Sequence, residues 1–179
     1  MRTIKVVLIG DVAVGKTWLC STYVSNESPK GYVTNIFNNF GKKIRFENID
    51  YLLSIWDTSG IKECNKISSL SYQQADVFIV CFSLINRESF KLTNGILEFL
   101  KSYEIPIILC GTKSDKKEER VIRASTGRKQ VEKYKCYEYI ETSALNFTNV
   151  NKLFDLVIEA AIKPKILKND RCCGIFNCC

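Results

Sequence analysis

The sequence has no histidine, and its nine cysteines include no Cys-x-x-Cys pair. Because structural zinc sites are built mainly from closely spaced cysteines and histidines, a zinc site in the body of the chain is not expected. Five cysteines are scattered, and Cys81 and Cys110 lie inside apolar segments typical of strands. We interpret these two as small buried hydrophobic residues in a reducing compartment, which argues against a disulfide scaffold.

Long apolar runs are also missing. The longest, Val77 to Ile85, is interrupted by Ser83 and is far shorter than the roughly 20 residues that cross a bilayer as a helix. The first residues, Met-Arg-Thr, have neither the pattern of a signal peptide nor a glycine for myristoylation. We therefore expect a protein that is made and kept in the cytosol.

The charge is biased toward one sign, with 26 Lys and Arg against 19 Asp and Glu, or +7 overall. Such a balance suits nucleic acid or an anionic membrane, but no basic stripe with interleaved aromatic residues is present, so nucleic acid is not expected. The basic excess in residues 163–171 directly precedes a group of four cysteines. These are Cys172, Cys173, Cys178 and Cys179. Their position favours a membrane surface.

A length of 179 residues and an apolar content of 46% fit one globular domain. Apolar runs alternate with amphipathic ones, which predicts an α/β fold with a six-stranded, mostly parallel sheet and helices on both faces. We expect strands over Thr3–Ile9, Lys42–Asn48, Tyr51–Trp56, Ala75–Phe82, Ile105–Gly111 and Tyr137–Glu141. We expect helices over Lys16–Val24, Ser68–Gln73, Ser89–Ser102, Arg123–Lys135 and Val150–Ile162.

Within this pattern, the second and third strands form a hairpin linked at residues 48–50, which adds one antiparallel edge to the sheet. The domain covers residues 1–162, and residues 163–179 are expected to form a flexible, basic, cysteine-rich tail.

The most informative motif is Gly10-x4-Gly15-Lys16-Thr17, which lies between an apolar strand and a helical segment. This spacing is that of a phosphate-binding loop, or P-loop. The backbone N–H groups of Ala13, Val14 and Gly15 can surround a phosphate at a helix N-terminus. Lys16 supplies a charge for the β and γ phosphates, and the Thr17 hydroxyl is a ligand for Mg²⁺. A glycine-rich turn with a solvated lysine is the alternative.

Three further motifs follow predicted strands, so the sheet would bring them to the same edge. In Trp56–Gly60, Asp57 can hold Mg²⁺ through water, and the Gly60 N–H can reach the γ phosphate. The next motif comprises Thr112, Lys113 and Asp115. The carboxylate of Asp115 can accept from both N1–H and N2–H of guanine, a donor pair that adenine does not have. The last motif comprises Ser143, Ala144 and Leu145, whose backbone N–H groups can donate to guanine O6. The alternative interpretation, a kinase or an ATPase, does not account for Asp115 or for the loop at residues 143–145.

With these motifs, the chain resembles the small GTPases of the Ras superfamily, and most closely the Rho/Rac branch. The resemblance covers roughly residues 3–162 and also includes Tyr32-Val33, residues 37–40 and 71–84. It implies a monomeric switch that binds GTP or GDP with Mg²⁺ and whose segments 30–40 and 57–70 rearrange with the γ phosphate. It also implies an effector-binding surface, formed by Tyr32, Phe37, Asn39 and Phe40. Only 27 residues (116–142) separate Asp115 from Ser143, which leaves no room for the Rho insert.

Four residues depart from the family pattern at the nucleotide, and together they leave no intact catalytic set. Val12 stands where the family has glycine, and Ile61 replaces the glutamine that orients the attacking water. Asn35 replaces the threonine that senses Mg²⁺, although its oxygen remains a candidate ligand. Ser28 replaces the phenylalanine that stacks on guanine, and such stacking is worth about 1–3 kcal/mol. These changes predict poor hydrolysis, fast exchange and a resting GTP-bound state.

The C-terminal sequence departs from the Rho pattern as well, because Phe176 is incompatible with a CaaX box. The terminal Cys178-Cys179 pair is similar to the doubly prenylated ends of Rab proteins, which implies a prenyltransferase as partner, and Cys172-Cys173 are candidates for palmitoylation. Two lipid chains, or one chain with a basic segment, suffice for stable attachment, here to the cytosolic face of a membrane. A zinc- or disulfide-forming cysteine cluster is the alternative.

Two other functions compete with a GTP-bound switch. One is an ordinary cycling GTPase in which a partner compensates for Val12 and Ile61. The other is a nucleotide-free interaction module in which the four departures are neutral drift. The retained P-loop and guanine motifs argue against the second.

Overall fold

The computed structural model describes residues 2–27, 37–58 and 72–162. Most of the helix expected over residues 68–73 lies outside these ranges, as does the tail. Tyr72 is described, and it is helical.

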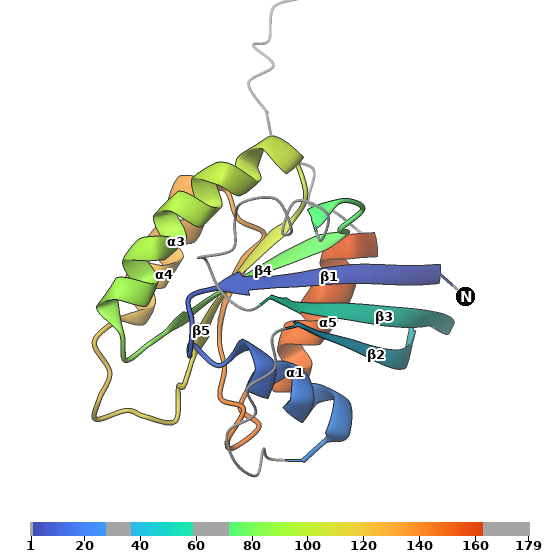
Figure 1. Cartoon of the computed structure of the whole chain (residues 1–179), viewed down its shortest axis with the longest axis horizontal. Coiled ribbons are helices and arrows are strands. Elements are labelled where there is room, and N and C mark those ends of the chain that lie inside the picture. The colour runs from blue at the N-terminus through green and yellow to red at the C-terminus, as the bar shows by residue number, and fades with distance from the viewer. Residues whose placement is uncertain (1, 28–36, 59–71, 163–179) are drawn as a thin grey trace, which may run out of the picture.

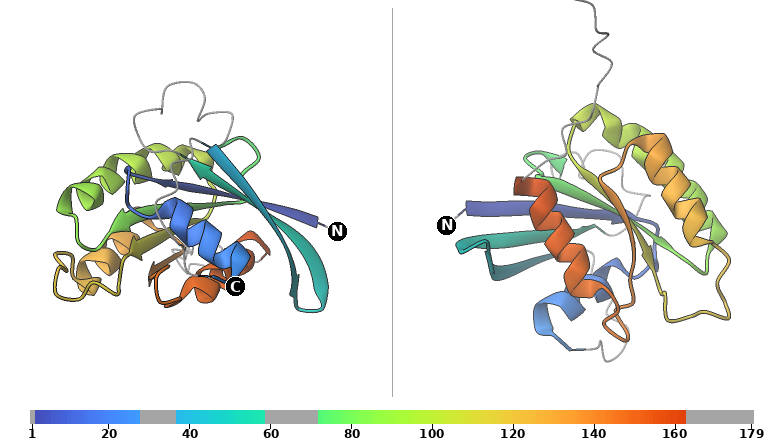
Figure 2. Two further views of the ribbon diagram at one scale, coloured as in Figure 1. Left: turned by 60° about the horizontal axis from the view of Figure 1, so that its bottom comes forward. Right: turned by 180° about the vertical axis from the view of Figure 1, so that it is seen from behind.

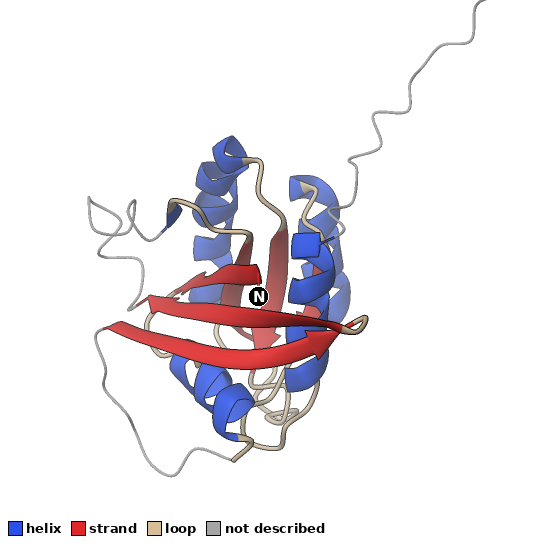
Figure 3. Ribbon diagram, turned by 90° about the vertical axis from the view of Figure 1, so that its right-hand side faces the viewer, coloured by secondary structure: helices blue, strands red, loops and turns tan. Residues whose placement is uncertain are grey.

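In the described part of the chain, six strands form a single sheet with the order β2-β3-β1-β4-β5-β6 (Figures 1 and 3). The strands are β1 (Arg2–Gly10), β2 (Phe37–Phe46), β3 (Ile49–Thr58), β4 (Val77–Ser83), β5 (Ile107–Thr112) and β6 (Glu138–Glu141). All neighbouring strands are parallel except β2 and β3, which pair antiparallel at one edge. The predicted fold class, a mostly parallel sheet with one antiparallel edge hairpin, is therefore confirmed.

Helices cover both faces of this sheet (Figure 2). They are α1 (Lys16–Ser25), α3 (Arg87–Leu100) with the short 3-10 helix η2 (Lys101–Tyr103), α4 (Ala124–Tyr134) and α5 (Val150–Ile162). Helices α1 and α5 share one hydrophobic core with the sheet, and α3 and α4 share the other. The alternating residues of β4 contribute to both cores, and every residue of β4 is buried. This explains why the strand reads as a continuous apolar run. None of the helices in the described ranges is long and apolar enough to cross a membrane.

The hairpin differs from the sequence-based expectation at both ends. Phe46 pairs directly with Ile49, so the turn consists of Glu47 and Asn48, with φ angles of 47° and 65°. A two-residue hairpin turn of this kind requires a left-handed conformation at both positions, which asparagine tolerates but glutamate seldom adopts. The prediction of a link at residues 48–50 was therefore wrong, since Glu47 gave no local signal for the turn.

Strand β2 also begins at Phe37, five residues before the predicted Lys42. Asparagines are poor strand formers, but the backbone of this segment continues its pairing with β3 as far as Thr58. Tertiary pairing has extended the strand beyond its local propensity.

Candidate functional site

The described parts of the four sequence motifs gather at the carboxyl ends of the parallel strands, the usual position of ligands in open α/β sheets. The P-loop follows β1, Asp57 lies at the end of β3, and the loops with Asp115 and Ser143 follow β5 and β6. In Figure 1, the P-loop runs from the tip of β1 to the start of α1.

The P-loop rests on the backbone of the central strand β4. A Cβ atom on Gly10 would lie 2.3 Å from the carbonyl oxygen of Cys81, so no residue with a side chain fits there without displacing the loop. Gly15 has a φ of 102° and Ala13 a φ of 58°, and α1 starts immediately afterwards at Lys16. Left-handed residues followed by a helix N-terminus form a concave site for an anion.

The Lys16 side chain lies across this loop. Its Nζ donates to the carbonyl oxygens of Gly10 (3.0 Å) and Asp11 (2.9 Å), and the residue is only 5% exposed. Burial lowers the pKa of Lys16, while the nearby Asp57 opposes that shift. Among the described residues, the hydrogen-bond acceptors of this buried ammonium are neutral carbonyl oxygens. It would gain strongly from a phosphate, because opposite charges attract more in a desolvated site.

Asp57 and Thr17 fit a divalent cation. The Thr17 hydroxyl donates to one carboxylate oxygen of Asp57, while the other, Oδ1, is buried and has no hydrogen-bond partner among the described residues. Burial raises the pKa of Asp57, whereas the Thr17 hydroxyl and the Lys16 ammonium lower it. Since Mg²⁺ prefers carboxylate, hydroxyl and water oxygens, this unpaired oxygen and the adjacent hydroxyl are suitable ligands. With Mg²⁺ held there, the ion would neutralise charge on the nucleotide phosphates.

The loop after β5 supports the P-loop from the side. The Thr112 hydroxyl lies 2.5 Å from the carbonyl oxygen of Val14 and donates to it, and Lys113 Nζ donates to the carbonyl oxygen of Ala13 at 2.9 Å. Lys113 itself has a φ of 62°, and burial lowers its pKa. The Thr112 hydroxyl also lies 3.0 Å from the carbonyl oxygen of Phe82, so its described contacts are with the P-loop and β4. A role of Thr112 in guanine binding stays a prediction.

The two predicted guanine loops meet directly. Ser143 Oγ donates to Asp115 Oδ1 at 2.5 Å, and Ser114 N donates to the Thr142 carbonyl oxygen at 3.0 Å. Helix α1 joins the same assembly, because the Thr22 hydroxyl donates to the Ala144 carbonyl oxygen at 3.3 Å. Leu145 is 55% exposed beside this pair. An aligned carboxylate next to an exposed apolar side chain can recognise the edge of a base and cover its ring.

Val12 is also exposed, at 57%, and its N–H donates to Asp11 Oδ1. In β2, Asn39 is exposed and Phe40 is partly buried against the core, while the Phe37 backbone pairs with Thr58. The remaining predicted site residues lie outside the described residues: Ser28, Tyr32, Asn35, Gly60, Ile61, Cys172, Cys173, Cys178 and Cys179.

Sequence reasoning missed one polar cluster next to the guanine loops. Arg120 Nη1 donates to Glu141 Oε2 at 2.9 Å, and Nη2 donates to Oε1 at 2.5 Å. The Tyr139 hydroxyl donates to the same Oε1 at 2.7 Å. The Glu141 carboxylate raises the pKa of Arg120. No local motif signals this cluster, because its arginine and glutamate are separated by 21 residues.

The sequence of this chain matches the Ras family model over residues 5–163. Because the match covers most of the 179 residues, the chain belongs to the Ras family. Proteins of this family are small GTP-binding GTPases that generally bind GTP or GDP with Mg²⁺ and typically engage effector proteins. In this chain, the Thr17 hydroxyl donates to Asp57 and Ser143 Oγ donates to Asp115, and the roles of these residues toward the nucleotide stay predictions.

Proposed function

We propose that this chain is a Rho/Rac-type small GTPase that stays bound to GTP and signals from a membrane surface. The observation that carries the proposal is Val12, an exposed branched side chain in the P-loop. A side chain at this position crowds the γ phosphate and the space that the arginine of an activating protein would enter.

Slow hydrolysis follows from combining Val12 with Ile61, which stands where the family has the water-orienting glutamine. An alkyl side chain offers no hydrogen bond to the attacking water. Intrinsic hydrolysis by Ras is only about 10⁻⁴ s⁻¹, and an arginine finger contributes about 10³–10⁵. Losing both contributions leaves turnover negligible on a signalling timescale. With Ser28 in place of a stacking aromatic residue, release of GDP is expected to be fast, so GTP reloads readily.

The test is the nucleotide bound to protein purified in Mg²⁺ and then incubated with GTP for hours, identified by chromatography. Persistent GTP supports a hydrolysis-poor switch. Steady conversion to GDP would show an ordinary cycling GTPase, and absence of nucleotide would show an interaction module that does not use it.

The double variant Val12→Gly/Ile61→Gln is expected to raise single-turnover hydrolysis at least about tenfold, toward the roughly 10⁻⁴ s⁻¹ of Ras. The two changes remove the alkyl groups to which we attribute the slow hydrolysis. Ile49→Gln is the matched control, because Ile49 is exposed at the hairpin, far along the sheet from the P-loop. Equal rates in the double variant and the parent would mean that these side chains do not limit hydrolysis.

Membrane attachment is proposed to use the Cys178-Cys179 pair, with Cys172-Cys173 and the basic residues 163–171 as additional signals. Each basic residue near an anionic leaflet adds about 1 kcal/mol. In fractionated cells, Cys178→Ser/Cys179→Ser is expected to move from the membrane to the soluble fraction, with loss of the lipid mass from the C-terminal peptide. A double variant that stays on the membrane contradicts prenylation at these residues.

A further inference from the structure

Arg120 and Glu141 form the least exposed ion pair in the described part of the chain. Their side chains are 30% and 20% exposed, against 44–72% for the side chains of the other four pairs. The contact is bidentate, with two parallel N–H···O bonds, which fixes direction as well as distance. Such a pair can set the geometry of the segments that carry it.

Each partner is held by a further contact. Arg120 Nε donates to the Ile122 carbonyl oxygen at 2.7 Å, and the Tyr139 hydroxyl donates to Glu141 at 2.7 Å. The Tyr139 ring fills the space beside Gly127 of α4, where an added Cβ would lie 2.3 Å from the ring. Because the Tyr139 ring packs against α4, its hydroxyl helps to fix the Glu141 carboxylate in the position where it accepts from Arg120.

The pair holds the loop that carries Asp115 against the end of β6, the strand that precedes Ser143. Arg120 lies five residues after Asp115, and Glu141 lies two residues before Ser143. The intervening Thr142 receives Ser114 N–H on its carbonyl oxygen at 3.0 Å and donates its own N–H to the Gly111 carbonyl oxygen at 2.8 Å. On the other side, Asn149 Nδ2 donates to the Glu141 carbonyl oxygen at 2.8 Å. Glu141 thus connects both base loops to the sheet.

We infer that Arg120 and Glu141 are positioning residues for guanine recognition, which align Asp115 through the Asp115–Ser143 hydrogen bond. Neither side chain needs to contact the nucleotide. This inference rests on the proposed binding of guanine nucleotides. An alignment role predicts a loss of base discrimination, whereas a purely structural role predicts only a loss of stability.

The probes are GDP and IDP, because hypoxanthine lacks the N2 amino group that a carboxylate at Asp115 would accept from. We expect the parent protein to bind GDP about 10- to 100-fold more tightly than IDP, because a hydrogen bond to a charged group usually contributes that much affinity. In Arg120→Gln and in Glu141→Gln, this ratio is expected to fall by about threefold or more, with faster release of GDP. Fluorescent GDP displacement gives both quantities.

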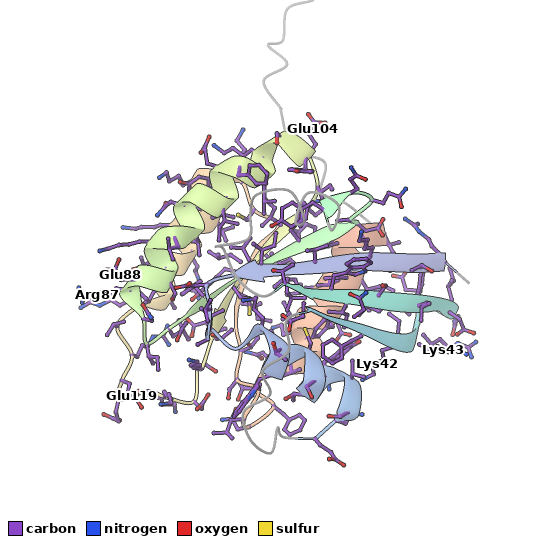
Figure 4. All side chains as sticks on the ribbon, in the orientation of Figure 1. Lys42, Lys43, Arg87, Glu88, Glu104 and Glu119 are labelled. Atoms are coloured by element: carbon purple, nitrogen blue, oxygen red, sulfur yellow. The ribbon has the colours of Figure 1, made fainter. Side chains whose placement is uncertain are left out.

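The matched control is Lys116→Gln/Glu119→Gln, which removes an ion pair of 2.8 Å in the same loop. Glu119 lies at the periphery of the molecule, at the outer end of this loop (Figure 4), so the control should change the ratio by less than about twofold, as exposed pairs contribute little. The reversed pair Arg120→Glu/Glu141→Arg should recover part of the lost discrimination, because it restores the attraction across the same gap.

The outcomes separate the two proposals. A parent protein that binds neither GDP nor GTP overturns the proposed function. A parent that prefers GDP, with variants that weaken both nucleotides equally, overturns the alignment role and leaves a structural one. If the glutamine variants unfold at saturating GDP, Arg120→Lys serves instead: it keeps the charge and loses the bidentate geometry, so an unchanged GDP/IDP ratio in that variant also overturns the inference.

Discussion

Lys16→Met is expected to lower the affinity for GTP by about 100-fold or more. The Lys16 ammonium is nearly fully buried, and its described hydrogen bonds go to two backbone carbonyl oxygens. A phosphate would give it a charged hydrogen-bond acceptor at the loop. Hydrogen bonds to charged groups are worth about 1.5–3 kcal/mol each, and two of them account for about 100-fold or more. Methionine is unbranched and nearly as long as lysine, but it has neither the charge nor the N–H donors.

The folded protein is expected to tolerate this change, because burial already disfavours the charged lysine and lowers its pKa. Isothermal titration with a non-hydrolysable GTP analogue measures the affinity, and thermal unfolding without nucleotide checks the fold. Lys43→Met is the control, since Lys43 is an exposed lysine on β2 (Figure 4). Comparable affinities for Lys16→Met and Lys43→Met would remove Lys16 from the phosphate site.

Asp115→Asn is expected to weaken GDP binding by about 100-fold and to improve binding of xanthosine diphosphate. Aspartate offers two acceptor oxygens, whereas asparagine offers one acceptor and one NH₂ donor. Guanine presents two donors on this edge, and the NH₂ of asparagine would face one of them. Xanthine has an oxygen in place of the N2 amino group, which the NH₂ can satisfy. Ser143 Oγ, now 2.5 Å from Asp115 Oδ1, can still donate to the amide oxygen.

Competition between GDP and xanthosine diphosphate for a fluorescent nucleotide measures this switch. Asp50→Asn makes the same chemical change at an exposed carboxylate of the hairpin, 3.9 Å from Arg45, and should leave the preference for guanine intact. An Asp115→Asn protein that still prefers GDP would mean that the carboxylate does not read the base edge.

The sequence predicted the parts of this molecule that depend on local patterns. Continuous apolar segments such as β4 identified strands buried on both faces, and the glycine spacing of residues 10–17 identified the P-loop. Placing Asp115 near Ser143 required only the rule that parallel strands end at the same edge, and the described hydrogen bond between them agrees.

What the sequence did not predict depends on contacts between distant segments. The start of β2 at Phe37 follows from pairing with β3 and contradicts the local preference of Asn38 and Asn39. The Thr112 hydroxyl lies against the P-loop because β5 ends beside it, a consequence of the sheet order. The Arg120–Glu141 pair joins segments that only the completed sheet brings together.

The hairpin turn at Glu47 and Asn48 is a suitable place to attach a label to this protein. Strands β2 and β3 run from that turn to Thr58 over ten residues of β3, which at about 3.3 Å per residue separates the turn from the nucleotide edge by roughly 30 Å. Both turn residues are exposed. A fluorophore or affinity peptide attached there stands at the opposite end of the sheet from the ligand, within range of energy transfer to a labelled nucleotide but outside its contacts.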